Sequence, residues 1–232
     1  RLADDLREER SHSVSLSADL YHTFGKVQTN LLVEGFYTIL DDVFALRDMD
    51  DAADGGKVKE RYNGSGATVR GFNVEGRAAF TRWFELQAGV TLQQSRYKEP
   101  EFWSEDAEVP PVRRMFRTPD AYGYFTASFK PVRNFTADLS GTCTGSMLVQ
   151  HMAGSGVAQD VAVSTPSFFD MNIRLSYDVR IYKEITMQLY GGVQNLFNAY
   201  QKDFDKGVDR DSGYIYGPSL PRSWFVGAKF SF

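Results

Sequence analysis

Four aspartates recur around a glycine in the segment Asp203-Phe204-Asp205-Lys206-Gly207-Val208-Asp209-Arg210-Asp211. Calcium prefers several carboxylate oxygens delivered by a flexible loop, and alternate spacing can provide them. An EF-hand loop also needs a bidentate Glu further on, and none follows at that spacing. The candidate calcium ligands are Asp203, Asp205, Asp209 and Asp211. The alternative is a solvated acidic loop in which one Lys and one Arg balance part of the charge.

A candidate of another kind is His151, which stands beside Met152 and near Met147 in a long polar stretch. An imidazole can ligate haem iron, so His151 is a candidate haem ligand. A polar loop residue is the alternative. The pair Phe102-Trp103, with Glu, Asp and Arg around it, can add an aromatic surface for ligand capture, or it can pack on its own loop.

Arrangements typical of bond-making catalysis are missing from the sequence. It has no Ser-His-Asp order, Cys-His pair, Gly-rich phosphate loop or His and carboxylate cluster. The single cysteine, Cys143, has no partner for an internal disulfide and no neighbour at metal-ligand spacing. We therefore expect no enzyme and no required cofactor. An outer-membrane protease or lipase is the enzymatic alternative.

The composition limits the elements that can position these residues. Among 232 residues, 42% are hydrophobic, 14% aromatic and 24% charged, and the mean hydropathy is -0.37. No apolar run reaches the roughly 18 residues of a transmembrane helix. Strands of a membrane barrel alternate lipid-facing and lumen-facing residues and average to a mildly polar chain, so a barrel is compatible. A net charge of -4 without a long basic run argues against nucleic-acid binding.

Hydrophobic residues recur with period two in segment after segment, whereas helical periodicity is nearly absent. In the segment from Ser13 to His22, for example, apolar side chains alternate with serines and an aspartate. We count about nine such strands. Their polar faces carry charged residues that must line an aqueous interior, because a small soluble barrel cannot bury so many unpaired charges. These residues include Asp19, Glu34, Glu75, Arg77, Glu85, Asp138, Asp170 and Arg174.

Short and long connections alternate along the chain. The short turns are at Phe24 to Lys26, Thr81 to Trp83, Lys130 to Asn134 and Arg180 to Glu184. The long segments are at Arg47 to Lys57, Arg96 to Arg117, Ser146 to Ser167 and Leu196 to Leu220. Short turns at one end and long loops at the other are the layout of outer-membrane barrels, with aromatic girdles at the strand ends. A soluble sandwich with aromatic strand ends is the alternative.

Two segments near the end of the chain resemble those of a known family. One is Gly192-Val193-Gln194-Asn195-Leu196-Phe197-Asn198, and the other combines Tyr216-Gly217-Pro218 with Pro221-Arg222-Ser223-Trp224-Phe225-Val226-Gly227. Both are similar to stretches of TonB-dependent outer-membrane receptors. Two upstream stretches, Arg117 to Gly123 and Leu139 to Met147, also resemble such receptors from Bacteroides-like bacteria. The terminal strand resembles the signal by which outer-membrane barrels are recognised for assembly. Its signal residues are Trp224, Val226, Phe230 and Phe232.

The resemblance implies a barrel of roughly 22 strands filled by a plug, which nine strands cannot close. We therefore expect residues 1–232 to be the C-terminal part of an all-β, antiparallel, up-and-down transmembrane barrel, with the plug domain absent. The N-terminal residues lack the pattern of a secretory signal. Implied partners are the TonB-ExbB-ExbD energy complex, reached through the missing plug, the barrel assembly machinery and the lipid bilayer of the bacterial outer membrane.

The resemblance also implies an extracellular nutrient ligand, with a surface lipoprotein as a further candidate partner. The segment after Phe197 departs from the pattern of starch-utilisation glycan importers. This departure favours an iron-siderophore, haem or a corrinoid (cobalamin) over a glycan. Calcium, if bound, would sit in an extracellular loop. The alternative function is a small porin or structural barrel, which requires an even strand count.

Overall fold

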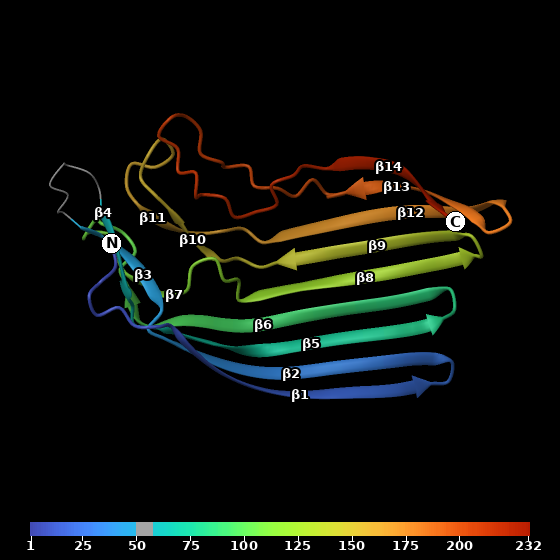
Figure 1. Ribbon diagram of the computed structural model, residues 1–232, viewed down its shortest axis with the longest axis horizontal. Helices are drawn as coiled ribbons and strands as arrows, with labels where there is room; N and C mark the ends of the chain where they lie inside the picture. Colours follow the sequence, from blue (N-terminus) through green and yellow to red (C-terminus); the bar gives the residue numbers. More distant parts are fainter. Residues whose placement is uncertain (50–57) are drawn as a thin grey trace.

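The computed structural model describes residues 1–49 and 58–232 (Figure 1). All regular secondary structure in this described part is β-strand. The strands are β1 (Arg10–Phe24), β2 (Val27–Asp41), β3 (Phe44–Met49), β4 (Val58–Asn63), β5 (Ala67–Thr81), β6 (Phe84–Glu101), β7 (Val112–Arg114), β8 (Ala121–Val132), β9 (Phe135–Thr144), β10 (Leu148–His151), β11 (Val161–Ser164), β12 (Phe168–Tyr182), β13 (Ile185–Gln194) and β14 (Ser223–Ser231).

Nine long strands form one antiparallel sheet in the order β1-β2-β5-β6-β8-β9-β12-β13-β14, and the short β7 pairs with β6. Each long strand lies beside the next long strand of the chain, which is an up-and-down meander (Figure 1). The predicted fold class and the count of about nine strands are confirmed. Within the described residues, β1 and β14 are the two edges of an open sheet.

One face of the sheet is apolar because the strands pair in a register that keeps their hydrophobic rows aligned. Val33 pairs with Val74, which pairs with Val90. Near the β14 edge of the sheet, on the same face, Ile173 pairs with Val193, which pairs with Trp224. Large side chains on this face are exposed, and Leu16 is 82% exposed. An apolar surface of this extent is typical of a sheet that faces lipid.

The opposite face carries a hydrogen-bonded polar network. Asn73 donates to Glu34 at 2.8 Å and accepts from the Thr91 hydroxyl at 2.8 Å. Gln87 donates to Glu75 at 2.8 Å. Further along the sheet, Ser128 donates to Asp138 at 2.5 Å. The charged residues predicted to line an aqueous interior therefore share one face, and several of them have partners from neighbouring strands.

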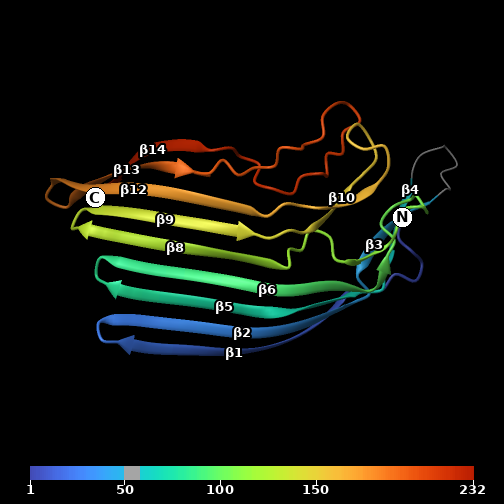
Figure 2. The same cartoon turned by 180° about the vertical axis from the view of Figure 1, so that it is seen from behind.

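The connections between long strands differ in length at the two ends of the sheet (Figures 1 and 2). Two-residue turns follow β1, β5, β8 and β12, and in the first of them Gly25 has a φ of 63° that favours glycine. All four short turns lie where the sequence predicted them. The C-terminus lies at this same end (Figure 1).

The long connections contain more regular structure than predicted. We expected irregular loops, but β3 pairs with β4 and β10 pairs with β11 as short hairpins, and β6 continues to Glu101 beside β7. The strands of these hairpins are only four to six residues long, and so short a run does not show a period of two clearly in the sequence. Residues 50–57 of the first long segment lie outside the described residues.

Candidate ligand-capture site

The long connections gather at one end of the sheet, where the β10–β11 hairpin packs on the segment between β13 and β14 (Figures 1 and 2). Met147, Val149 and Tyr214 form a buried cluster, against which Val163 and Tyr216 pack. A hydrophobic cluster of this kind fixes two loops that are far apart in the sequence. The cluster therefore gives the long-loop end a defined surface.

His151 belongs to this packed region. Its ring stacks on Tyr214, with ring centroids 3.7 Å apart and an interplanar angle of 8°. Its Nε2 lies 2.9 Å from Oδ1 of Asp205, and the two side chains are only 9% and 4% exposed. The structure thus places His151, the predicted haem ligand, in contact with Asp205, a predicted calcium ligand. The haem role of His151 remains a prediction, and in this structure its Nε2 faces a carboxylate.

The four aspartates of the predicted calcium segment do not gather in one place. Asp205 accepts from the backbone N–H of Asp211 at 3.0 Å, and Asp211 accepts from the N–H of Met152 at 2.8 Å. Asp203 accepts from two tyrosine hydroxyls, while Asp209 is exposed. In residues 1–49 and 58–232, no group of three or more His, Cys, Asp or Glu is arranged to hold a metal ion. Calcium binding here remains a prediction, and the observed carboxylates order the loop.

Asp203, Tyr214 and Tyr216 shift one another's pKa values. Tyr214 donates to Asp203 at 3.0 Å and Tyr216 donates at 2.6 Å. Burial raises the pKa of Asp203, but these hydrogen bonds outweigh it and hold the pKa below its usual value. Burial first, and then the hydrogen bond to Asp203, raises the pKa of Tyr214 to about 12. The same causes, in the same order, raise the pKa of Tyr216.

The raised pKa of Tyr214 predicts how the loop responds to alkali. A raised pKa in the folded state contributes stability that is fully present below the unfolded value of 10.0 and is lost as pH rises towards about 12. Asp203→Asn removes the negative charge, so we expect the pKa of Tyr214 to fall. The measurement is the tyrosinate absorbance of each protein minus that of its Tyr214→Phe counterpart. An unchanged midpoint in Asp203→Asn would contradict the coupling.

Two buried polar residues support this loop: Gln201, which the sequence did not single out, and Asn195, which was quoted only within the segment that resembles the family. Gln201 is 1% exposed, donates to the carbonyl of Tyr214 at 3.0 Å and accepts from the N–H of Tyr216 at 2.9 Å. Asn195, which is 4% exposed, donates to the carbonyls of Ala199 and Leu220. The motif around Asn195 therefore closes the long segment between β13 and β14. Burial was the missing signal, since nothing local distinguishes a buried Gln from an exposed one.

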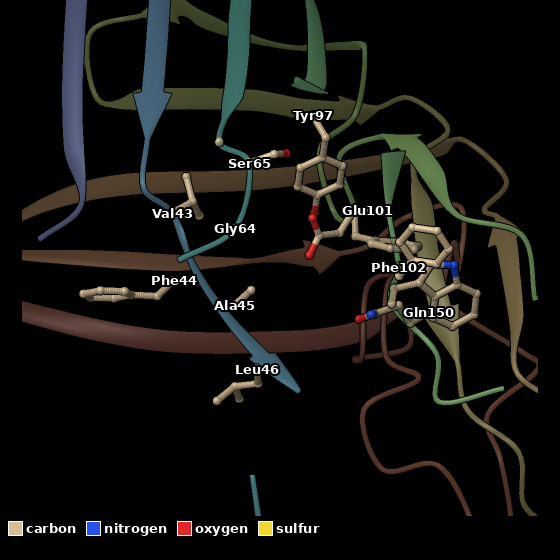
Figure 3. A pocket seen from close by; sticks show the side chains of 13 residues that line it. Val43, Phe44, Ala45, Leu46, Gly64, Ser65, Tyr97, Glu101, Phe102 and Gln150 are labelled. Atoms are coloured by element: carbon tan, nitrogen blue, oxygen red, sulfur yellow. The ribbon is translucent and has the colours of Figure 1, made fainter. Parts of the chain in front are cut away.

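A cavity of about 310 Å³ lies at the long-loop end beside β3 and the last residues of β6 (Figure 3). Tyr97, Glu101 and Phe102 contribute side chains from β6 and its continuation, and Gln150 contributes from β10 (Figure 3). Trp103 also lines the cavity and packs edge-on against Phe116 at 5.4 Å. The aromatic pair singled out in the sequence thus lines a cavity and also packs within its loop.

A polar cavity of about 520 Å³ lies below the segment between β13 and β14. Its lining includes Ser140, Asp170, Asn172 and Gln194 from the polar face of the sheet. Asp170 Oδ1 is buried and has no hydrogen-bond partner within the described part of the chain. This cavity connects the polar face with the underside of the long-loop end.

A wide sheet with one apolar face, one polar face and long loops at one end defines an outer-membrane barrel portion. Residues 2–196 match the family model described as TonB dependent receptor-like, beta-barrel. The chain belongs to this family, which is a family of receptors and transporters rather than an enzyme class, and which resides in the bacterial outer membrane. No curated protein sequence matches the chain.

Solved structures share the fold at low sequence identity. The ferric-catecholate import receptor Fiu from K12 E. coli is 18% identical with a TM-score of 0.66, covering 97% of this chain and 28% of that one. The copper transporter OprC is 14% identical with a TM-score of 0.62, covering 99% and 32%. A mutant ferric enterobactin receptor, PfeA, from Pseudomonas aeruginosa is 14% identical with a TM-score of 0.58, covering 94% and 31%. The chain spans about a third of the length of these structures.

The residues predicted as an assembly signal lie on the edge strand β14 and just beyond it. The side chains of Trp224, Val226, Phe230 and Phe232 are all more than half exposed. Trp224 and Val226 continue the apolar face of β13, because they pair with Val193 and Gly191. Their recognition by the assembly machinery remains a prediction. The family match ends at residue 196, upstream of this strand.

Proposed function

We propose that the chain is the C-terminal part of the barrel of a TonB-dependent receptor that takes up a scarce, bulky nutrient. The observation that carries this proposal is the family match over residues 2–196 on a sheet that is apolar on one face and polar on the other. The apolar face contacts the outer-membrane lipid, and the polar face surrounds a plug. The long-loop end then faces the cell exterior and captures the ligand.

An iron-siderophore, haem or a corrinoid is the proposed substrate. Solved structures of the same fold include receptors named for ferric catecholate and ferric enterobactin, and this supports the iron chelate most directly. The aromatic cavity of about 310 Å³ is smaller than such a ligand, so it would hold one part of it. The remaining surface is supplied by the β10–β11 hairpin and the segment between β13 and β14.

TonB-dependent receptors interact with TonB and with their ligands. For this chain we propose that energy comes from the TonB-ExbB-ExbD complex through a plug domain. A surface lipoprotein that presents the ligand is a further proposed partner. The barrel assembly machinery inserts the strands into the membrane.

Uptake by a strain that lacks the gene tests the proposed function. Radiolabelled ferric siderophores, haem and cobalamin are supplied separately, with TonB present or deleted. We expect uptake of one of them to require both this protein and TonB. Uptake that needs the protein but persists without TonB would instead favour a porin. If all three ligands enter equally well with and without the gene, the proposed substrates are wrong.

A further inference from the structure

Glu101 is a half-buried carboxylate in the aromatic cavity. Its side chain lies among those of Tyr97, Phe102 and Gln150 (Figure 3). Burial raises the pKa of Glu101 above its usual value. Among the side chains that the structure describes, those of residues 1–46 and 58–232, none makes a hydrogen bond or ion pair with the Glu101 carboxylate. A carboxylate taken partly out of water without a partner is costly, and a bound cation would offset that cost.

The cations along this part of β6 and β7 are already engaged elsewhere. Arg113 pairs with Glu99 at 3.8 Å, and Lys98 pairs with Asp41. Arg114 pairs with Asp120 at 3.1 Å, and Arg96 contacts the same carboxylate at 3.7 Å. Among the described side chains, Glu101 is thus an acid that none of these four cations neutralises.

The walls of the cavity are suited to a soft cation. Phe102 is 74% exposed, and the Trp103 ring is held by its edge-on contact with Phe116. Aromatic faces attract an alkylammonium ion through the ring quadrupole, and a desolvated site strengthens that attraction. Phe44 also lines the cavity, but its ring is turned away from Tyr97 and Glu101 (Figure 3) and lies under the Arg61 guanidinium at 5.6 Å.

We propose that the cavity beside Glu101 binds the alkylammonium group of an organic cation, with Glu101 as the counter-ion and Phe102 and Trp103 as aromatic walls. A single carboxylate with aromatic neighbours suits such a group better than a metal ion, which needs several oxygen ligands. The inference rests on the proposed function only in placing the cavity at the cell exterior. It adds that the captured ligand carries a protonated or quaternary amine.

Binding of choline to the purified protein in detergent, measured by calorimetry at constant ionic strength, tests the proposal. Dimethylbutanol, the uncharged carbon isostere of choline, is the matched ligand control. We expect choline to bind and the isostere to bind at least tenfold more weakly. Glu101→Gln should weaken the binding of choline about tenfold, and Phe102→Ala should weaken it several-fold. Glu99→Gln, which alters an exposed acid two residues away, should leave choline binding unchanged.

Three outcomes would overturn the proposal. Equal binding of choline and its isostere would show that the cavity recognises apolar bulk only. Equal effects of Glu99→Gln and Glu101→Gln would show a general charge effect. Absence of choline binding at millimolar concentrations would show that the cavity does not bind an alkylammonium group. The uptake experiment with the strain that lacks the gene separates failure of the alkylammonium site from failure of the proposed function. A receptor whose ligand carries no amine would still show TonB-dependent uptake there.

Discussion

Arginine in place of Leu16 is expected to lower the free energy of unfolding of the barrel in lipid by about 2–4 kcal/mol. Leu16 lies on the apolar face of β1, opposite Gly35, and is 82% exposed. If this face contacts the hydrocarbon of the bilayer, a guanidinium there must enter a medium without water. In a soluble sheet, the same substitution at an exposed position would change stability by less than about 0.5 kcal/mol.

Ser17→Arg is the matched control for this prediction. Ser17 is the next residue of β1, points to the polar face and pairs with Glu34, so an arginine there gains a nearby carboxylate. Unfolding by denaturant in phospholipid vesicles, followed by tryptophan fluorescence, gives both free energies. A similar small change in the two variants would contradict the assignment of the apolar face to lipid.

Alanine in place of Asp205 is expected to speed amide hydrogen exchange at Asp211 about a hundredfold. The Asp205 side chain is 4% exposed, contacts Nε2 of His151 and accepts from the N–H of Asp211. Hydrogen bonds to a buried charged group contribute about 1.5–3 kcal/mol each, and each 1.4 kcal/mol corresponds to a factor of ten. Loss of the Asp205 carboxylate therefore loosens the contact between the β10–β11 hairpin and the segment between β13 and β14.

Asp209→Ala is the control for Asp205→Ala. Asp209 lies in the same segment but its side chain is exposed, so its removal should leave exchange at Asp211 within about twofold of the native rate. Exchange mass spectrometry of peptides that cover Met152 and Asp211 supplies the comparison. Equal acceleration in both variants would show that the acidic character of the segment matters, rather than the buried carboxylate.

The strands, their faces and the short turns could be predicted from the sequence because each depends on neighbours in the chain. A period of two in Val14, Leu16, Ala18 and Leu20 is enough to assign one face of β1. The register then extends that face across the sheet, since a slip of one residue would turn every apolar side chain over. The family resemblance near Asn195 likewise rests on a contiguous segment.

The arrangement of the long-loop end could not be predicted, because its contacts join residues far apart in the chain. His151 and Asp205 are 54 residues apart, and each was interpreted alone as a metal or haem ligand. Only folding shows that they face each other beneath Tyr214. Glu101 was not distinguished from other acids for the same reason, since its burial and its lack of an ion pair with any described side chain are properties of the surroundings. The sequence by itself thus determined the barrel sheet and its two faces, whereas tertiary packing alone decided which loop side chains are free to meet a ligand.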